Sequence, residues 1–103
     1  PPYNIEKISD SEYLITIAVA GFSKGDIKVT VDNGVLNVLG HKEDPAKQTL
    51  IHQGIANRDF QRTWNLAEFV EVTSAECKNG MLEIRLVQEV PETAKPKEIE
   101  IKF

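Results

Sequence analysis

The sequence predicts an all-β fold, an antiparallel sandwich of two sheets, and three observations support it. Apolar and polar residues alternate with a period of two, which places the apolar ones on one face of a pleated strand. Valine and isoleucine, which favour strands, are frequent in these stretches. The stretches follow one another at the spacing of a two-sheet sandwich, and the best helical candidate is only a short turn at residues 67–69.

Two Asn-Gly dipeptides predict tight hairpins. Asn33-Gly34 and Asn79-Gly80 each stand between two alternating stretches. Both residue types tolerate positive φ, which the type I′ hairpin turn requires. In chain order, the expected strands are 3–9, 12–19, 26–32, 35–41, 59–65, 72–78 and 81–87.

The composition indicates one small soluble domain. The chain has 103 residues, of which 41% are apolar and 27% charged, and its net charge is −4. Its longest basic group is Lys95-Pro96-Lys97, which is too little for a nucleic-acid surface. No apolar run approaches the roughly 18 residues of a membrane span, and no secretory leader is recognisable, so we expect no membrane partner. The single Cys77 fits a reducing compartment, and we expect a cytoplasmic protein.

The polar stretch 42–58 is longer than most loops of compact domains, which suggests that it has a function. It contains a small apolar island, Leu50-Ile51, that is far in sequence from any obvious partner strand. Pairing with an exposed sheet edge of another chain would satisfy the backbone groups of this island. The sequence therefore favours a long strand-swapping loop, and a plain surface loop is the alternative.

The last residues, 88–103, combine a stiff polar linker with a terminal apolar strand, and we expect an extended C-terminal tail. Ile99 and Ile101 project to one side and can fill two pockets along a sheet edge. Burying each isoleucine is worth about 1.5–3 kcal/mol before ordering costs, so one such contact is expected to be weak and reversible. An edge strand of the same domain is the alternative.

No group of residues in the sequence indicates catalysis, a metal or a cofactor. Cys77 lies on an expected strand beside Ala75, so a small core or groove residue is a better interpretation than a nucleophile. His41 precedes the polar stretch and His52 lies within it, and neither has ligands at metal-binding spacing. Asp59 is interpreted as part of a solvated rim. We therefore expect a protein that is not an enzyme.

Several short motifs occur in an order that is specific to one family. They are Pro1-Pro2-Tyr3-Asn4-Ile5, Ala18-Val19-Ala20-Gly21-Phe22, Asn33-Gly34-Val35-Leu36-Asn37-Val38, Gln53-Gly54-Ile55-Ala56-Asn57-Arg58-Asp59-Phe60, Asn79-Gly80-Met81-Leu82 and Ile99-Glu100-Ile101. With these motifs, nearly the whole chain resembles the α-crystallin domain of small heat shock proteins, in particular the proteobacterial inclusion-body-binding class. The resemblance implies an immunoglobulin-like sandwich at residues 1–88 and a C-terminal extension at residues 89–103.

The resemblance also implies an ATP-independent holdase chaperone, which captures unfolding client proteins and hands them to ATP-dependent refolding chaperones. In this family the long loop carries a strand that pairs with the first strand of a neighbouring subunit. The resemblance thus implies a homodimer whose interface includes Tyr3, Ile5, Leu50, Ile51 and Arg62. Family members carry an N-terminal arm before this domain, and this chain begins at the domain, so we expect dimers with reduced client holding.

The Ile-x-Ile tail resembles the assembly motif of the family, which docks into a groove between two strands of another dimer and builds larger oligomers. The resemblance assigns Ile99 and Ile101 as the tail anchors. The groove residues that it implies are Ile27, Val29, Val31, Thr73, Ala75 and Cys77.

Arg62 is the polar residue for which we expect a role in assembly. Phe60 and Trp64 flank it at a spacing of two, so the three side chains share one strand face. A guanidinium group in this setting is expected to be desolvated and paired with a carboxylate across a subunit boundary. A surface arginine with its stem against Trp64 is the alternative.

Two other functions stay open from the sequence. A monomeric co-chaperone-type β-sandwich that binds a dedicated partner would lack both the 42–58 loop and the Ile-x-Ile tail. A small hydrolase that uses Cys77 would need a base and an orienting group, and neither is identifiable. A dimer in size-exclusion chromatography would separate the chaperone from the monomeric module.

Overall fold

The computed structural model describes residues 1–42, 51–52, 58–91 and 99–102 of the chain. Over these ranges the secondary structure consists of β-strands and one short 3₁₀ turn, η1, which the sequence pattern did not predict. The elements are β1 (Tyr3–Lys7), β2 (Glu12–Ala18), η1 (Lys24–Asp26), β3 (Ile27–Asp32), β4 (Val35–Gly40), β5 (Phe60–Asn65), β6 (Val70–Lys78) and β7 (Met81–Gln88). Over the same ranges, no helix is long and apolar enough to cross a membrane.

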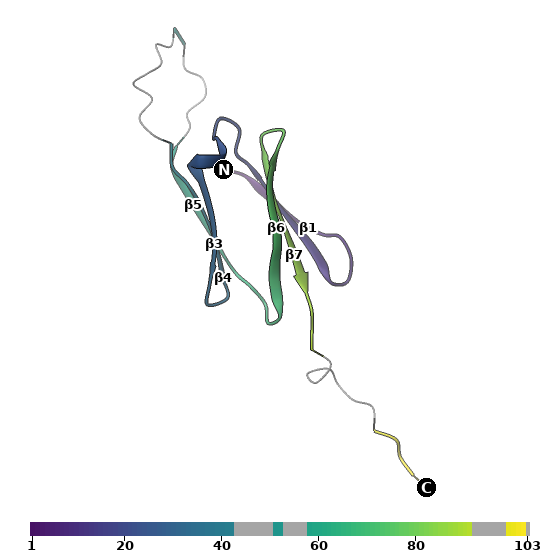
Figure 1. The fold of residues 1–103 in the computed structure, drawn as a ribbon. Helices are drawn as coiled ribbons and strands as arrows, with labels where there is room; N and C mark the ends of the chain where they lie inside the picture. Colours follow the sequence, from purple (N-terminus) through teal and green to yellow (C-terminus); the bar gives the residue numbers. More distant parts are fainter. Residues whose placement is uncertain (43–50, 53–57, 92–98, 103) are drawn as a thin grey trace.

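The strands form two antiparallel sheets that pack face to face (Figure 1). One sheet has the strand order β1-β2-β7-β6, and the other has the order β3-β4-β5. β1 and β5 are edge strands on the same side of the sandwich, where the rings of Tyr3 and Trp64 meet edge to face with their centroids 5.3 Å apart. β3 and β6 are the edges on the opposite side. The predicted two-sheet antiparallel sandwich is therefore confirmed.

The core lies between the sheets and is built from alternate residues of the central strands. Ile17 on β2, Ile84 on β7, and Leu36 and Val38 on β4 are fully buried. All four are branched aliphatic residues on the apolar face that the period of two predicts. In contrast, every residue of β1 is exposed. The centre of the sandwich is thus buried, whereas its edge strand β1 is exposed to solvent.

Both predicted Asn-Gly hairpins are present. Asn33 and Gly34 have φ values of 49° and 75°, and Asn79 and Gly80 have values of 52° and 75°. Positive φ at both central positions is the geometry of the type I′ turn, whose twist matches the flanking strands. These two turns fix the β3–β4 and β6–β7 registers.

The start of β6 differs from the prediction. The strand begins at Val70 rather than at residue 72, because Val70 and Val72 both pack against the core. Residues before it form a turn, in which the Val70 N–H donates to the Ala67 carbonyl at 3.2 Å and Phe69 has a φ of 66°. This turn replaces the short helical turn considered at residues 67–69.

Gly40, the last residue of β4, is expected to tolerate no side chain. A Cβ atom at this position would overlap the ring of Phe60, which itself packs edge to face on Phe22 with a centroid distance of 5.3 Å. Replacing Gly40 with alanine is expected to lower the free energy of unfolding by about 1–3 kcal/mol, the usual range for overpacking. Gly25→Ala is the control, since no atom lies within 4 Å of its added Cβ. Urea denaturation followed by tryptophan fluorescence measures both variants, and equal stability would contradict the prediction.

Candidate functional site

The outer edge of β1 carries backbone groups that no described strand satisfies. In the β1–β2 ladder, the Ala18 N–H donates to the Pro2 carbonyl at 3.1 Å. Hydrogen-bonded pairs recur at every second residue of an antiparallel ladder, so the even-numbered residues of β1 bond to β2 and the odd-numbered ones point outward. The outward N–H and C=O groups belong to Tyr3, Ile5 and Lys7. An extended segment can therefore join the sheet at this edge.

The side chains of Tyr3 and Ile5 form an uncovered apolar patch beside this edge. They stand opposite Ile17 and Ile15 in the β1–β2 register, so they lie on the core-facing side of their sheet. They nevertheless remain 46% and 56% exposed, because both belong to an edge strand that the facing sheet covers only in part. The edge thus offers both hydrogen-bonding groups and apolar surface.

Arg62 lies half-buried on β5, on the strand face that it shares with Phe60 and Trp64. Its Nη2 donates to the Pro1 carbonyl at 3.3 Å. Its Nε is buried and has no hydrogen-bond partner within the described part of the chain. The same part of the chain offers it no ion pair. The carboxylate expected beside Arg62 is thus not supplied from these residues.

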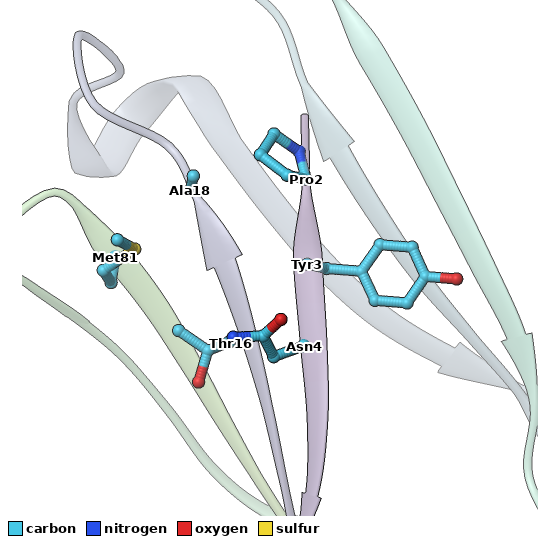
Figure 2. Close-up of a pocket in the computed structure, with 6 residues that line it drawn as sticks. All are labelled: Pro2, Tyr3, Asn4, Thr16, Ala18 and Met81. Carbon is cyan, nitrogen blue, oxygen red and sulfur yellow. The ribbon is translucent and has the colours of Figure 1, made fainter.

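A small hollow of about 150 Å³ lies on the other side of β1, at the outer surface of the sheet. Figure 2 shows that the ring of Tyr3 points away from Thr16 and Met81, which line the hollow. The described lining contains no histidine, carboxylate or ammonium group, so nothing in it indicates catalysis. Its residues are Pro2, Tyr3, Asn4, Thr16, Ala18 and Met81.

A larger groove of about 460 Å³ opens between β3 and β6, on the side of the sandwich opposite to β1. Most of its lining residues are apolar, and two are charged, Lys24 and Glu76. Four of the six residues that the sequence assigned to a groove line it, namely Ile27, Val29, Ala75 and Cys77. The other three lining residues, Lys24, Glu76 and Leu82, were not among those expected from the sequence.

Val31 and Thr73 were also assigned to the groove, but they lie outside its lining. Val31 is 50% exposed near the end of β3. A β-bulge between Val72 and Ser74 makes Thr73 an extra residue in β6, and its hydroxyl donates to the Arg85 carbonyl at 3.2 Å. An inserted residue leaves the pairing and bends the strand, so Thr73 does not continue the face of Ala75.

The apolar residues expected to occupy these surfaces are exposed where the structure describes them. Ile51 is fully exposed, while Leu50 lies outside the described residues. Ile99 and Ile101 are 83% and 75% exposed. None of these three isoleucines is buried by the described part of its own chain.

His41 and Asp59, which the sequence analysis treated separately, form a pair. His41 Nδ1 and Asp59 Oδ2 are 2.7 Å apart, and the Lys42 N–H donates to Asp59 Oδ1 at 3.1 Å. The hydrogen bond to His41 is the largest of the causes that lower the pKa of Asp59, and the Lys42 N–H bond and the charge of His41 lower it further. The described residues contain no cluster of three or more potential metal ligands, and the Cys77 thiol is exposed.

The known sequences to which this chain is similar belong to one family. Residues 5–102 match the Hsp20/alpha crystallin family. Small heat shock protein HspD of Bradyrhizobium diazoefficiens is 46% identical over 101 residues, which cover 98% of this chain and 67% of the relative. Small heat shock protein IbpA of Serratia proteamaculans is 45% identical over 103 residues, which cover 99% of this chain and 75% of the relative.

Comparison with solved structures extends the likeness to the three-dimensional fold. Small heat shock protein AgsA from Salmonella typhimurium, truncated at its C-terminus, aligns with a TM-score of 0.78 and 32% identity over 98% of each chain. The small heat shock protein from Synechococcus phage S-ShM2 aligns with a TM-score of 0.73 and 32% identity over 89% of this chain. The likeness therefore includes the whole sandwich.

Proposed function

Because this chain belongs to the Hsp20/alpha crystallin family, we propose that the β1 edge and the β3–β6 groove are the two assembly surfaces of a small heat shock protein. Members of this family are ATP-independent holdase chaperones rather than enzymes, and they bind unfolding clients and form oligomers. In this proposal residues 1–88 form the α-crystallin domain and residues 89–103 form a C-terminal extension. The proposed location is the cytoplasm.

The open β1 edge is the observation that carries the proposal. Its outward backbone groups and the exposed Tyr3 and Ile5 side chains match an extended apolar segment, and the sequence offers an apolar pair for this role, Leu50-Ile51. In a strand-exchanged dimer, each chain donates this segment and accepts the one from its partner, which is a self-complementary two-fold arrangement. The same arrangement can bring a carboxylate to the part of the half-buried Arg62 side chain that stays exposed.

The β3–β6 groove is the proposed docking site for Ile99 and Ile101 of another dimer. Its walls present Ile27 and Val29 on one side and Ala75 on the other, so an alternating Ile-x-Ile strand can bury both isoleucines. Each such contact is weak, but several of them together hold an assembly while any single one opens.

Reversible cover of apolar surface is the proposed basis of holdase activity. A chaperone of this kind needs no catalytic group, but it needs apolar surface that becomes available when clients unfold. Unfolding clients present exposed apolar segments, which compete for the surfaces that strand exchange and tail docking cover. Held clients then pass to ATP-dependent refolding chaperones.

Light scattering of a heated client protein, with no ATP present, tests the proposed function. The chain is expected to suppress the increase in scattering in proportion to its concentration. In the control, an inert protein of about the size of lysozyme replaces the chain and is heated with the client. This control measures the effect of crowding alone. Undiminished scattering at a several-fold excess of chain over client would overturn the proposal, and a chain that is monomeric at all concentrations would favour the co-chaperone-type binding module instead.

Arg62→Ala is expected to weaken the proposed dimer by about tenfold or more, because it leaves a partner acceptor without its guanidinium group. Arg85→Ala is the control, since Arg85 lies on the outer sheet surface and pairs with Glu83 at 3.7 Å. Sedimentation-equilibrium ultracentrifugation gives the dimer dissociation constant of each variant. An unchanged constant for Arg62→Ala would contradict the assigned role.

A further inference from the structure

A cluster of polar side chains joins the two ends of the 42–58 stretch. His41 follows β4 and Asp59 precedes β5, and they lie 18 positions apart in the sequence. The last pair of the β4–β5 ladder is Gly40 and Phe60, so the same register carried one step further brings His41 opposite Asp59. The 2.7 Å contact between Nδ1 and Oδ2 therefore joins the residue before the 42–58 stretch to the residue after it, just beyond the end of the ladder.

The cluster is also attached to the connection between β2 and β3. The Lys42 side chain reaches across, and its Nζ donates to the Gly21 carbonyl at 2.8 Å. The His41 N–H donates to the Asp26 carbonyl at 2.9 Å. The carboxylate of Asp26 is in turn held by the N–H and hydroxyl of Ser23, at 2.8 and 3.0 Å. Three separate parts of the chain therefore meet at this end of the sandwich (Figure 1).

Little of the stability of the fold can depend on the contact between the His41 and Asp59 side chains. The side chains of His41 and Asp59 are 72% and 60% exposed, and an exposed ion pair of this kind contributes little to folding because water screens it. The bonds instead restrict the position and direction in which both ends of the stretch leave the sandwich. Restricting a segment before it binds lowers the entropy that binding costs.

We infer that His41, Lys42 and Asp59 form a clamp that positions the stretch carrying Ile51 for strand exchange with the β1 edge of a second copy. The inference rests on the proposed strand-exchanged dimer. The three residues are positioning residues, since none of them is assigned to the contact itself. A dimer contains two such clamps, so their effect on assembly is larger than their effect on the folding of one chain.

The test compares Asp59→Ala, Asp59→Asn and the control Asp32→Ala in the full chain. Asp32 is an exposed aspartate at the opposite end of the same sheet, in the β3–β4 hairpin. Asp59→Ala is expected to raise the dimer dissociation constant about three- to tenfold and to leave the thermal midpoint within about 2 °C of the parent. Asp59→Asn keeps an acceptor for the Lys42 N–H and an amide that can bond a neutral His41 ring, so it is expected to restore most of the affinity.

Two results would overturn the clamp. One is that the parent chain dimerises and Asp59→Ala dimerises with the same dissociation constant. In that case the proposed dimer stands and only the clamp fails. The other is a thermal midpoint of Asp59→Ala that falls far below that of Asp32→Ala, since the pair would then stabilise the fold itself. A parent chain that stays monomeric at all concentrations would remove the clamp together with the proposed dimer.

Discussion

Replacing Ile5 with proline is expected to leave the sandwich folded and to abolish the strand-exchanged dimer. The N–H of Ile5 points to the open edge of β1 and makes no bond to β2, so the β1–β2 ladder loses no hydrogen bond. Proline is tolerated on edge strands at positions of this kind. It removes the donor that an incoming strand needs, and it also removes the exposed isoleucine side chain.

The expected size of this effect follows from the groups removed. One hydrogen bond is worth about 0.5–1.5 kcal/mol net, and the isoleucine contact adds up to about 1.5–3 kcal/mol. The dissociation constant is therefore expected to rise by roughly 30-fold to more than 1,000-fold, since every 1.4 kcal/mol is tenfold. Sedimentation equilibrium over a range of concentrations measures it, and circular dichroism checks that the sandwich is intact.

Two further variants separate the causes. Ile5→Ala keeps the N–H and loses only the side chain, so it is expected to weaken the dimer less than proline does. Glu6→Pro removes an N–H that the ladder register directs to β2, so it is expected to detach β1 and lower the thermal midpoint. A dimer of unchanged affinity in a folded Ile5→Pro chain would show that β1 is not the edge that a partner uses.

The strands of this protein could be predicted from the sequence because each of them obeys a local rule. The apolar period of two places Ile15 and Ile17 on the same face without knowledge of their neighbours. Asn33-Gly34 sets the register of β3 and β4 through its own backbone preferences. Such rules act within a few residues, and a pattern can therefore detect them.

The lining of the groove could be predicted only in part, because a bulge interrupts the period of two. Before the bulge, Val70 and Val72 face the core, and after it Ala75 and Cys77 occupy the same side. The inward residues thus change from even to odd numbers at Thr73. No residue type in this stretch marks the insertion, so alternation extended backwards from Cys77 places Thr73 on the wrong face.

The pairing of His41 with Asp59 could not be predicted for a different reason. It depends on the register of β4 against β5, and the connection between these strands is too long to fix a register through its turn. The ladder that brings the two residues together is set by core packing of residues such as Val38 opposite Arg62. Long-range register of this kind is a property of the folded sheet rather than of a sequence window.

Replacing both Ile99 and Ile101 with serine is expected to remove tail docking without affecting the sandwich. The two side chains are largely exposed in the chain itself, so their loss leaves no cavity in its core. If both enter the β3–β6 groove of another dimer, about 3–6 kcal/mol of gross burial energy is lost, which is on the order of 100-fold in affinity after ordering costs. Multi-angle light scattering is expected to show less association of dimers in the variant than in the parent chain at the same concentration.

A peptide of residues 97–103 tests the groove directly, with the double-serine chain as its receptor. Binding of a fluorescent peptide is expected to be saturable and to weaken about tenfold or more when Ala75 is replaced with glutamate, which places a charge in the groove. A peptide with Glu100 replaced by serine is the control, because alternation directs this side chain away from the groove. Equal binding of the peptide to the double-serine chain with and without Ala75→Glu would exclude the β3–β6 surface as the docking site. A carboxylate in the groove is expected to lower the affinity of any apolar peptide that docks there.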